Sequence, residues 1–584
     1  MFFVSGFLIL AFVIAGLFIA NQFEQTDRAE GQEPGTAAYD AAFGWLMDVG
    51  DYMGWFYVLA TAFFLIFVVW LMFSRYGKVK LGPDDSTPEF GTVAWFAMLF
   101  TAGMGIGLVF WGAAEPAGYA IDEVVVGGAE TEAQVARDAM DPTLFHWGFQ
   151  PWSIYIVLGL ALAYFSYRKG LPMRPAAAFY PLIGNRIYGT TGHVIDILAV
   201  IGTMFGLATS LGLGTMQINA GLTYLSDAIP GDNIWIQVGI ITVITLIALV
   251  SVLAGIDKGV RRLSVLNLWM AAALLAFVFV AGPTLFILNG IFDWTGTYLT
   301  GLVGNTFSVV DGSLNPELSE WQSAWTFFYW GWWISWAPFV GMFIARISKG
   351  RTIRQFVVGT LFAPVGVSVV WYSTFGGSAI FYDMMSQEAG EDAVIAEGGE
   401  DNATYLLMEQ LNIPHILVLA ATLLTILVVA IFFITSSDSG SLVIDMLTNG
   451  GDRNPVPYQR AFWVLLEGLV TAVILVGGGF GALWILRATS VTTGLPFAVV
   501  LVFVCFGMLK ALRQENLAAM QAREMGLPAS IFSRYGGPPG HSGLAAEEGE
   551  TVTVTQAPSE AEELTVETPE NPTEEKPDRG TGGE

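Results

Sequence analysis

The sequence has little cysteine and histidine. Cys505 is the only cysteine in 584 residues, and the four histidines are scattered. A disulfide framework and a cysteine-based metal site are therefore excluded, and a histidine metal centre is not expected. No Walker loop, HExxH motif, paired-carboxylate motif or Ser/His/Asp grouping occurs. We therefore expect neither an enzyme nor a cofactor, and any transport would be driven by an ion gradient rather than directly by ATP.

Charged residues are also scarce, at 13% of the chain, whereas 54% of the residues are hydrophobic and the mean hydropathy is +0.58. A soluble protein of this length could not bury so much apolar surface around one core. Many apolar runs approach the ~20 residues that cross a bilayer. The sequence therefore predicts an all-α membrane protein with about twelve transmembrane helices. The segments are 2–21, 54–74, 92–113, 145–166, 194–225, 234–255, 264–290, 323–345, 355–382, 413–434, 459–480 and 489–510.

Basic residues concentrate in every second loop between these segments. The intervening loops 22–52, 114–141, 291–321 and 383–412 are rich in Asp and Glu. By the positive-inside rule, this alternation places both termini in the cytoplasm of a multi-pass protein of the cell (inner or cytoplasmic) membrane. Arg487 departs from the pattern, and we expect it to snorkel to the interface.

The net charge of −26 is unusual for a membrane protein. Basic patches that would bind nucleic acid are absent. Acidic water-facing surface keeps proteins soluble in high salt, so the acidic loops suggest a salt-loving host. The alternative is an acidic tail with no ecological meaning. From Gly537 the chain is rich in Gly, Pro, Glu and Thr, and this stretch is expected to be disordered.

Three glycines interrupt the third segment, within Thr101–Leu108. Each weakens a helix by about 1 kcal/mol relative to alanine. Transporters use such unwound segments to offer backbone groups to ions and substrate. The alternative is a small-residue face for helix packing. Glu115 follows in the same region, where it either has a functional role or lies at the outer interface.

Aromatic residues gather in the fourth and eighth segments. Aromatic faces attract cations, and aromatic cages hold quaternary ammonium groups. The alternative is an interfacial aromatic belt, which would lie at the ends of a span. From the residues alone both interpretations stay open. The side chains are Trp147, Trp152 and Tyr155, and then Trp325, Trp332, Trp333 and Trp336.

Hydroxyl groups flank Asp438 at the cytoplasmic end of the tenth segment, in Thr435–Ser441. Hydroxyl and carboxylate oxygens suit a hard cation. Alternatively, these hydroxyls bond back to their own helix. Thr203, Thr209 and Ser210 in the fifth segment form a similar but weaker pattern.

The stretch from Trp332 to Arg354 closely resembles the signature of the betaine/choline/carnitine transporter family. The segment 103–116 resembles the glycine-rich third helix of that family, and 145–155 resembles its fourth. The resemblance covers about residues 1–512, and its closest match is to sodium-coupled glycine betaine transporters.

This resemblance implies a leucine-transporter-like fold of two inverted five-helix repeats, preceded by two extra helices. It also implies a homotrimer surrounded by membrane lipid, with alternating access to a site at the membrane midplane. The expected divisions are two N-terminal helices and a cytoplasmic loop (1–91), the first repeat (92–292), an extracellular connection (293–322), the second repeat (323–513) and a largely disordered cytoplasmic tail (514–584).

The resemblance also implies which residues bind substrate and sodium. The aromatic box would be Trp147, Trp152, Tyr155, Trp332, Trp333 and Trp336, beside a substrate-contacting segment of Gly105, Ile106 and Gly107. One sodium site would use Thr101, Met104, Phe432, Thr435 and Ser436. A possible second sodium site would use Thr203, Tyr155 and Phe339.

Two positions refine the expected substrate and coupling ion. Choline-type, proton-coupled members tend to carry Asp where this chain has Gly107, and a neutral site suits a zwitterion. Thr435 and Ser436 retain the hydroxyl pair that sodium-independent exchangers lose. Leu207 stands where sodium-coupled members can carry a second hydroxyl of the fifth helix, which leaves the second sodium site open.

The resulting prediction is a secondary transporter that imports glycine betaine, an osmoprotectant, by sodium symport. The alternatives are a proton-coupled or exchange carrier for choline, carnitine or ectoine, and a gated channel. A membrane enzyme is the least favoured, because no acid/base pair is placed for catalysis.

Overall fold

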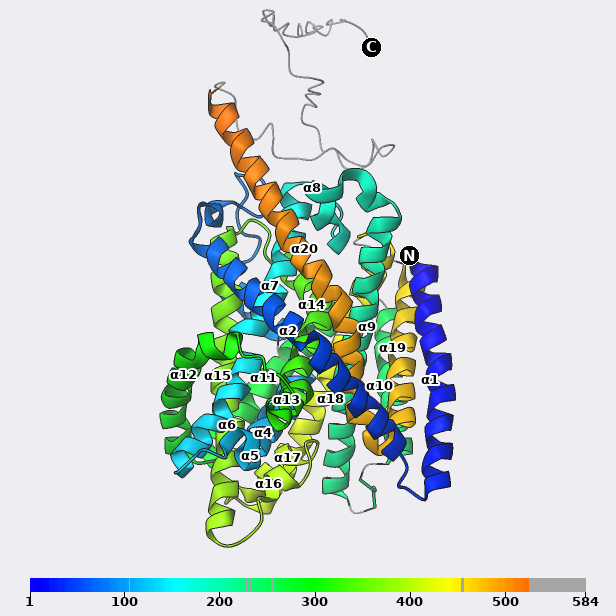
Figure 1. Ribbon diagram of the computed structural model, residues 1–584, viewed down its shortest axis with the longest axis vertical. Coiled ribbons are helices and arrows are strands. Elements are labelled where there is room, and N and C mark those ends of the chain that lie inside the picture. Colours follow the sequence, from blue (N-terminus) through cyan, green and yellow to red (C-terminus); the bar gives the residue numbers. More distant parts are fainter. Residues whose placement is uncertain (104, 227, 232, 254–256, 453–455, 525–584) are drawn as a thin grey trace, which may run out of the picture. The chain divides into compact units, whose positions relative to one another are not determined.

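Helices form nearly all of the secondary structure (Figure 1). The computed structural model describes residues 1–524 except 104, 227, 232, 254–256 and 453–455. Chain contacts divide the protein into Met1–Gly537 and Pro538–Glu584, and the described residues all fall in the first unit. Within them no strand occurs, and Lys80 and Thr352 form an isolated antiparallel bridge. The prediction of an all-helical fold is confirmed.

Among the described residues, ten helices are long and apolar enough to cross a membrane. Their number and hydropathy fit a bilayer-spanning protein, because ~20 apolar residues at 1.5 Å each span the hydrocarbon core. They are α1 (Phe2–Glu30), α2 (Thr36–Phe73), the run Glu132–Arg168, α9 (Thr190–Leu225), α10 (Ile234–Leu253), α11 (Asp257–Ala281), α15 (Ile353–Glu388), α18 (His415–Thr448), α19 (Pro457–Gly478) and α20 (Ala482–Glu524).

Two expected spans are not among these ten, so the number twelve stays a prediction. The segment 92–113 is divided into α3 (Thr92–Gly103) and α4 (Ile106–Ile121). The segment 323–345 forms a π-helical turn, Ser323–Phe327, followed by α14 (Phe328–Ile347). Both segments are helical, but the first is interrupted, and the second is rich in tryptophan and phenylalanine rather than in aliphatic residues.

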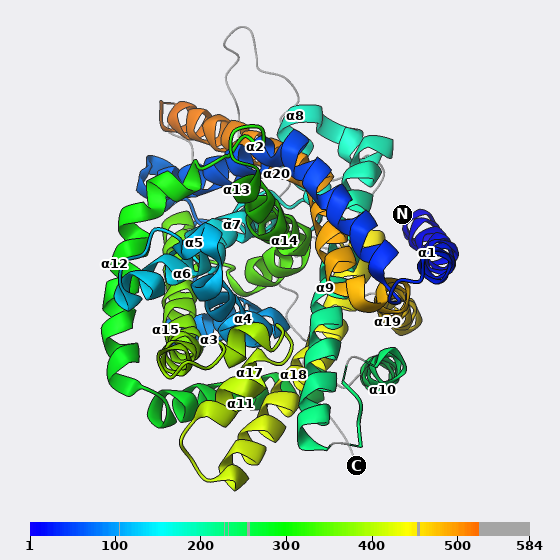
Figure 2. The ribbon, with the colours of Figure 1, turned by 60° about the horizontal axis from the view of Figure 1, so that its bottom comes forward.

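Helix α14 lies in the interior of the helical assembly (Figure 2). It packs against α9, α20 and α7 (Phe149–Ala163), and nearly all of its residues are buried. By contrast, α1 exposes large apolar side chains such as Phe3, Phe7 and Phe18. A helix that is apolar and buried all round belongs to a core, whereas exposed apolar rows suit contact with lipid.

The first residues of the predicted tail continue α20. Glu515 accepts hydrogen bonds from Arg168 Nε at 2.6 Å and from the Tyr164 hydroxyl at 2.6 Å. Lys169 Nζ lies 2.8 Å from the same carboxylate. These contacts hold this part of α20 against the end of the run Glu132–Arg168. The tail prediction from residue 525 onward lies outside the described residues.

The crossing of α14 and α20 depends on two glycines. A Cβ added at Gly494 would lie 2.5 Å from the carbonyl oxygen of Gly331, which leaves no space for a methyl group. We therefore expect Gly494→Ala to separate the two helices and to cost about 1–3 kcal/mol of stability. Thermal unfolding of the purified protein should show a lower midpoint. Gly239→Ala on α10 is the matched control, because nothing lies within 4 Å of its Cβ position; equal midpoints for both variants would contradict the prediction.

Candidate functional site

Two interruptions in helices occur beside α14. Gly105 precedes α4 in extended conformation, with φ −126° and ψ −166°. Gly148 separates α6 (Glu132–Trp147) from α7, with φ −96° and ψ −135°. A Cβ at Gly148 would meet the Tyr298 hydroxyl at 2.3 Å, so this close approach requires glycine. Each break leaves backbone N–H groups at a helix start without intrahelical partners.

The six predicted aromatic side chains are all buried, each at most 6% exposed. Trp332 and Trp333 are stacked with ring centroids 4.6 Å apart, and Trp147 meets Trp333 edge to face at 4.8 Å. The other three extend this cluster through pairwise ring contacts. These are Tyr155–Trp333 at 6.3 Å, Trp152–Tyr155 at 5.6 Å and Trp332–Trp336 at 6.5 Å. The structure thus brings together all six residues, which we call the aromatic cluster.

The glycine segment packs directly against this cluster. A Cβ at Gly107 would lie 2.5 Å from Trp332 and 3.1 Å from Trp147, and one at Gly105 would lie 3.1 Å from Trp336. A side chain at residue 107 would therefore have to displace two indole rings. The absence of side chains allows the backbone at the start of α4 to approach the aromatic faces.

Two tyrosines of the site were not predicted. The rings of Tyr329 and Tyr372 lie 5.6 Å and 5.2 Å from that of Trp147. Tyr329 is one helical turn before Trp333, so helical periodicity could have identified it. Tyr372 lies on α15, and no local pattern in the sequence indicates that it meets Trp147.

Glu115 is fully buried inside the protein. Its carboxylate accepts hydrogen bonds from Trp147 Nε1 at 2.7 Å and from the Tyr329 hydroxyl. His146 Nδ1 lies 3.0 Å from the other carboxylate oxygen, and His146 Nε2 lies 3.0 Å from the Thr326 hydroxyl. A buried carboxylate needs such donors, and here they fix the orientation of the Trp147 ring.

Arg487 is also buried, at 1% exposure, and it does not snorkel as expected. Its guanidinium carbon lies 4.5 Å from the ring centroid of Trp325 and 4.8 Å from that of Trp484. The Glu400 carboxylate is 3.6 Å from the guanidinium. Aromatic faces and one carboxylate thus stabilise a cation inside the protein.

Three of the residues predicted for the first sodium site line one cavity of about 80 Å³. They are Phe432, Thr435 and Ser436, and Gly105 and Trp336 line the same cavity. The Thr435 hydroxyl donates to the Ile431 carbonyl at 2.9 Å and keeps its oxygen lone pairs available. Asp438 instead pairs with Arg460 at 2.7 Å. The side chain of Thr101 and the whole of Met104 lie outside the described residues.

The residues predicted for a second sodium site are distributed differently. Phe339 lines the cavity that contains Thr435 and Ser436. The Thr203 hydroxyl donates to the Ala199 carbonyl of its own helix at 2.7 Å, and Tyr155 contacts Trp333. Phe339 therefore lies with the residues of the first predicted site. In the described part of the chain, no group of three or more His, Cys, Asp or Glu side chains could hold a metal ion.

The Glu115 network should contribute to stability as a unit. Glu115→Gln keeps the size of the side chain but turns one acceptor into a donor that faces Trp147, Tyr329 or His146. An unsatisfied buried group costs about 1–3 kcal/mol, so we expect a clearly lower thermal midpoint. Glu130→Gln removes the same charge at an exposed position and should leave the midpoint unchanged. A Glu115→Gln protein as stable as that control would refute the structural role of the network.

The comparisons with known proteins agree on one family. The model described as "BCCT, betaine/carnitine/choline family transporter" matches residues 1–517. A probable glycine betaine transporter of Desulfitobacterium hafniense is 43% identical over 79% of this chain and 90% of its own length. A glycine betaine/proline/choline/ectoine transporter of Vibrio parahaemolyticus is 44% identical, over 83% and 84% respectively. The glycine betaine transporter of Bacillus subtilis is 40% identical, over 82% and 91%. This chain, with its many apolar helices, therefore belongs to the betaine/carnitine/choline family of membrane transporters.

Proposed function

We propose that this transporter imports glycine betaine by sodium symport, through alternating access to the aromatic cluster. The observation that carries the proposal is the packing of the Gly105–Gly107 segment against Trp147, Trp332 and Trp336. Aromatic faces suit a trimethylammonium group, which has no proton to donate and is attracted to π-electrons. The family and the names of its relatives support a quaternary-ammonium substrate.

The packing of the rings suggests how the site opens. Trp147 and Trp333 are in contact at 4.8 Å and leave no room for a trimethylammonium group between them. Binding at this position would require the two rings to separate. Trp147 is the last residue of α6, directly before the break at Gly148, so a change of backbone angles there would move it. A local hinge of this kind fits alternating access.

The carboxylate of betaine would meet the start of α4. The first N–H groups of a helix lack intrahelical partners, and the helix dipole favours an anion there. Gly105 and Gly107 leave the backbone of this helix start uncovered by side chains. Residue 107 is glycine and carries no acidic side chain, so the carboxylate of a zwitterion would not be repelled at that position.

Sodium would bind in the cavity lined by Thr435 and Ser436. Hydroxyl and carbonyl oxygens are suitable ligands for a hard cation. Trp336, a member of the aromatic cluster, lines this cavity together with Gly105, which packs against it. An ion that fixes these two residues would favour the conformation that binds betaine, and this shared preference is thermodynamic coupling.

We also infer the setting in which the transporter works. The alternation of basic and acidic loops supports cytoplasmic termini in a bacterial cell membrane. The family resemblance supports a homotrimer. The acidic outer loops support a salt-loving host, in which betaine import would balance osmotic pressure. Growth in high salt with betaine supplied, unchanged after deletion of the gene, would argue against this role.

The first test is uptake of radiolabelled glycine betaine into proteoliposomes, with and without an inward sodium gradient. We expect saturable, sodium-dependent uptake in the native protein. Trp333→Ala removes a central ring and should reduce uptake at least about tenfold, since a buried cation–π contact is worth ~2 kcal/mol. Trp235→Ala is the control, because Trp235 is 74% exposed on α10. Full uptake by Trp333→Ala would exclude the aromatic cluster as the substrate site.

The sodium site can be tested separately. Thr435→Val keeps the shape of the side chain but removes the hydroxyl oxygen, so the sodium concentration for half-maximal uptake should rise about tenfold. Thr425→Val on the same helix is the matched control, because the Thr425 hydroxyl is buried and bonds to the Ala421 carbonyl. Sodium-independent uptake in the native protein would favour an exchange or proton-coupled carrier. If the two variants showed equal sodium dependence, Thr435 would not be a sodium ligand.

A further inference from the structure

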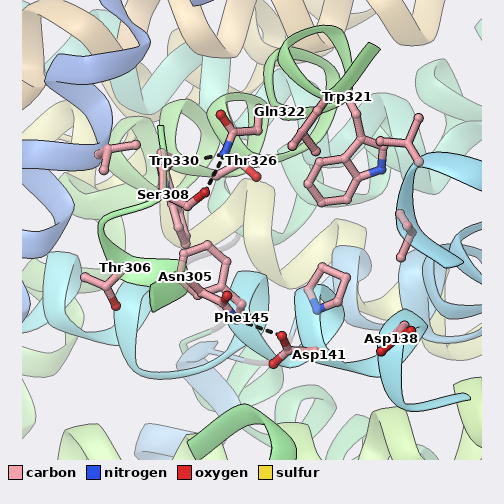
Figure 3. A pocket seen from close by; sticks show the side chains of 15 residues that line it. Asp138, Asp141, Phe145, Asn305, Thr306, Ser308, Trp321, Gln322, Thr326 and Trp330 are labelled. Carbon is pink, nitrogen blue, oxygen red and sulfur yellow. Dashed lines mark hydrogen bonds between the residues drawn. The ribbon is translucent and has the colours of Figure 1, made fainter. Parts of the chain in front are cut away.

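A second cavity, of about 300 Å³, is lined by no residue of the aromatic cluster, and Figure 3 shows its lining. Its walls come from α2, α5 (Glu123–Val126), α6, the end of α12 (Thr284–Thr306) and the segment after it, α13 (Pro316–Gln322), the π-helical turn and the start of α14. The volume is within the range of small-molecule sites. On the predicted topology this cavity belongs to the outer side of the membrane.

The charge of this cavity is negative. Asp138 and Asp141 both line it, from one face of α6 (Figure 3). One oxygen of Asp141 accepts from Asn305 Nδ2 at 2.8 Å, and the other is buried without a hydrogen-bond partner among the described residues. The neighbouring Arg137 pairs with Asp293 at 2.6 Å, away from the lining. The described residues that line the cavity include no Lys or Arg, so the two carboxylates are not neutralised there.

Aromatic side chains line the rest of the cavity. Trp321 comes from α13, Trp330 from α14 and Phe145 from α6, and Trp330 is 1% exposed. The rings of Phe145 and Trp330 meet edge to face at 5.1 Å. Trp321 Nε1 also lacks a hydrogen-bond partner among the described residues. Buried aromatic surface facing unneutralised carboxylates has the chemistry of a site for an organic cation.

The residues of this cavity differ from those of the aromatic cluster. Thr326 lines the cavity and is hydrogen-bonded to His146. His146 in turn contacts Glu115, which accepts a hydrogen bond from Trp147. His146 and Glu115 therefore lie between the cavity and Trp147. A variant that damages one site need not damage the other.

We propose that this cavity binds a small alkylammonium cation that has no carboxylate. A bare inorganic cation would need several oxygen ligands, whereas much of this lining is aromatic and aliphatic. Glycine betaine fits poorly, because Asp138 and Asp141 would repel its carboxylate. Choline has the same ammonium group without that charge. The cavity would therefore select a cation, whereas the aromatic cluster would select a zwitterion. The proposal does not depend on betaine transport by the cluster.

The test is binding of radiolabelled choline to the purified full-length Trp333→Ala protein at constant ionic strength, with excess glycine betaine present. We expect saturable choline binding to persist, because betaine does not compete in this cavity. Adding Asp141→Asn should weaken that binding about tenfold, which corresponds to 1.4 kcal/mol. Glu130→Gln removes the same charge from an exposed position of the same outer loop, outside the lining, and its effect should stay within about twofold.

A second variant separates loss of binding from loss of folding. Trp321→Leu keeps both carboxylates and an apolar wall, and should weaken choline binding while the thermal midpoint stays near that of the parent. Absence of saturable choline binding in the Trp333→Ala protein would overturn the proposal. So would equal effects of Asp141→Asn and Glu130→Gln, or displacement of choline by sodium or calcium more readily than by tetramethylammonium.

Discussion

The site depends first on one buried carboxylate. Glu115 on α4 is held by Trp147 from α6, by Tyr329 from α14 and by His146. A buried carboxylate needs such donors, so in this conformation the hydrogen bonds to Glu115 hold the three helices together around it. The same hydrogen bonds set the angle of the Trp147 ring, and that ring contacts both stacked indoles of α14. A polar interaction therefore determines the geometry of an aromatic site.

Glycine provides the complementary constraint. Large rings on α14 can lie against α4 only because residues 105 and 107 lack side chains, and α14 can lie against α20 only through Gly331 and Gly494. In lipid there is little hydrophobic force between helices, so close backbone approach and dispersion contacts must hold them together. The glycines that weaken α4 as a helix thus strengthen its packing. The sequence allowed two interpretations of this segment: a small-residue packing face or an unwound binding segment. Both describe the same residues.

Much of this arrangement could be predicted from the sequence, and the failures have a common cause. Hydropathy located the helical segments, and the motif residues Trp147, Trp333 and Thr435 proved to lie where helices α4, α6, α14 and α18 meet. Hydropathy says nothing, however, about which neighbour covers a given face. The burial of Glu115 and Arg487 and the contact of Tyr372 with Trp147 depend on tertiary packing between segments distant in the chain. The expectation that Arg487 snorkels to the interface was therefore wrong, because neighbouring aromatic side chains cover it.

The two predicted ligand sites share walls, and this matters more for function than either site alone. Gly105 and Trp336 line the cavity of Thr435 and Ser436, Gly105 packs against Trp336, and Trp336 is itself part of the aromatic cluster. Two ligands influence each other only when both favour the same conformation of some element. Here that element would be the start of α4 with the Trp336 ring. Because a packed indole has few alternative positions, an ion that fixes Trp336 also limits the positions open to Trp332 and, through it, to Trp147. Coupling between ion and substrate would then need no signal across the protein, since the two sites are separated by one helix start and one aromatic ring.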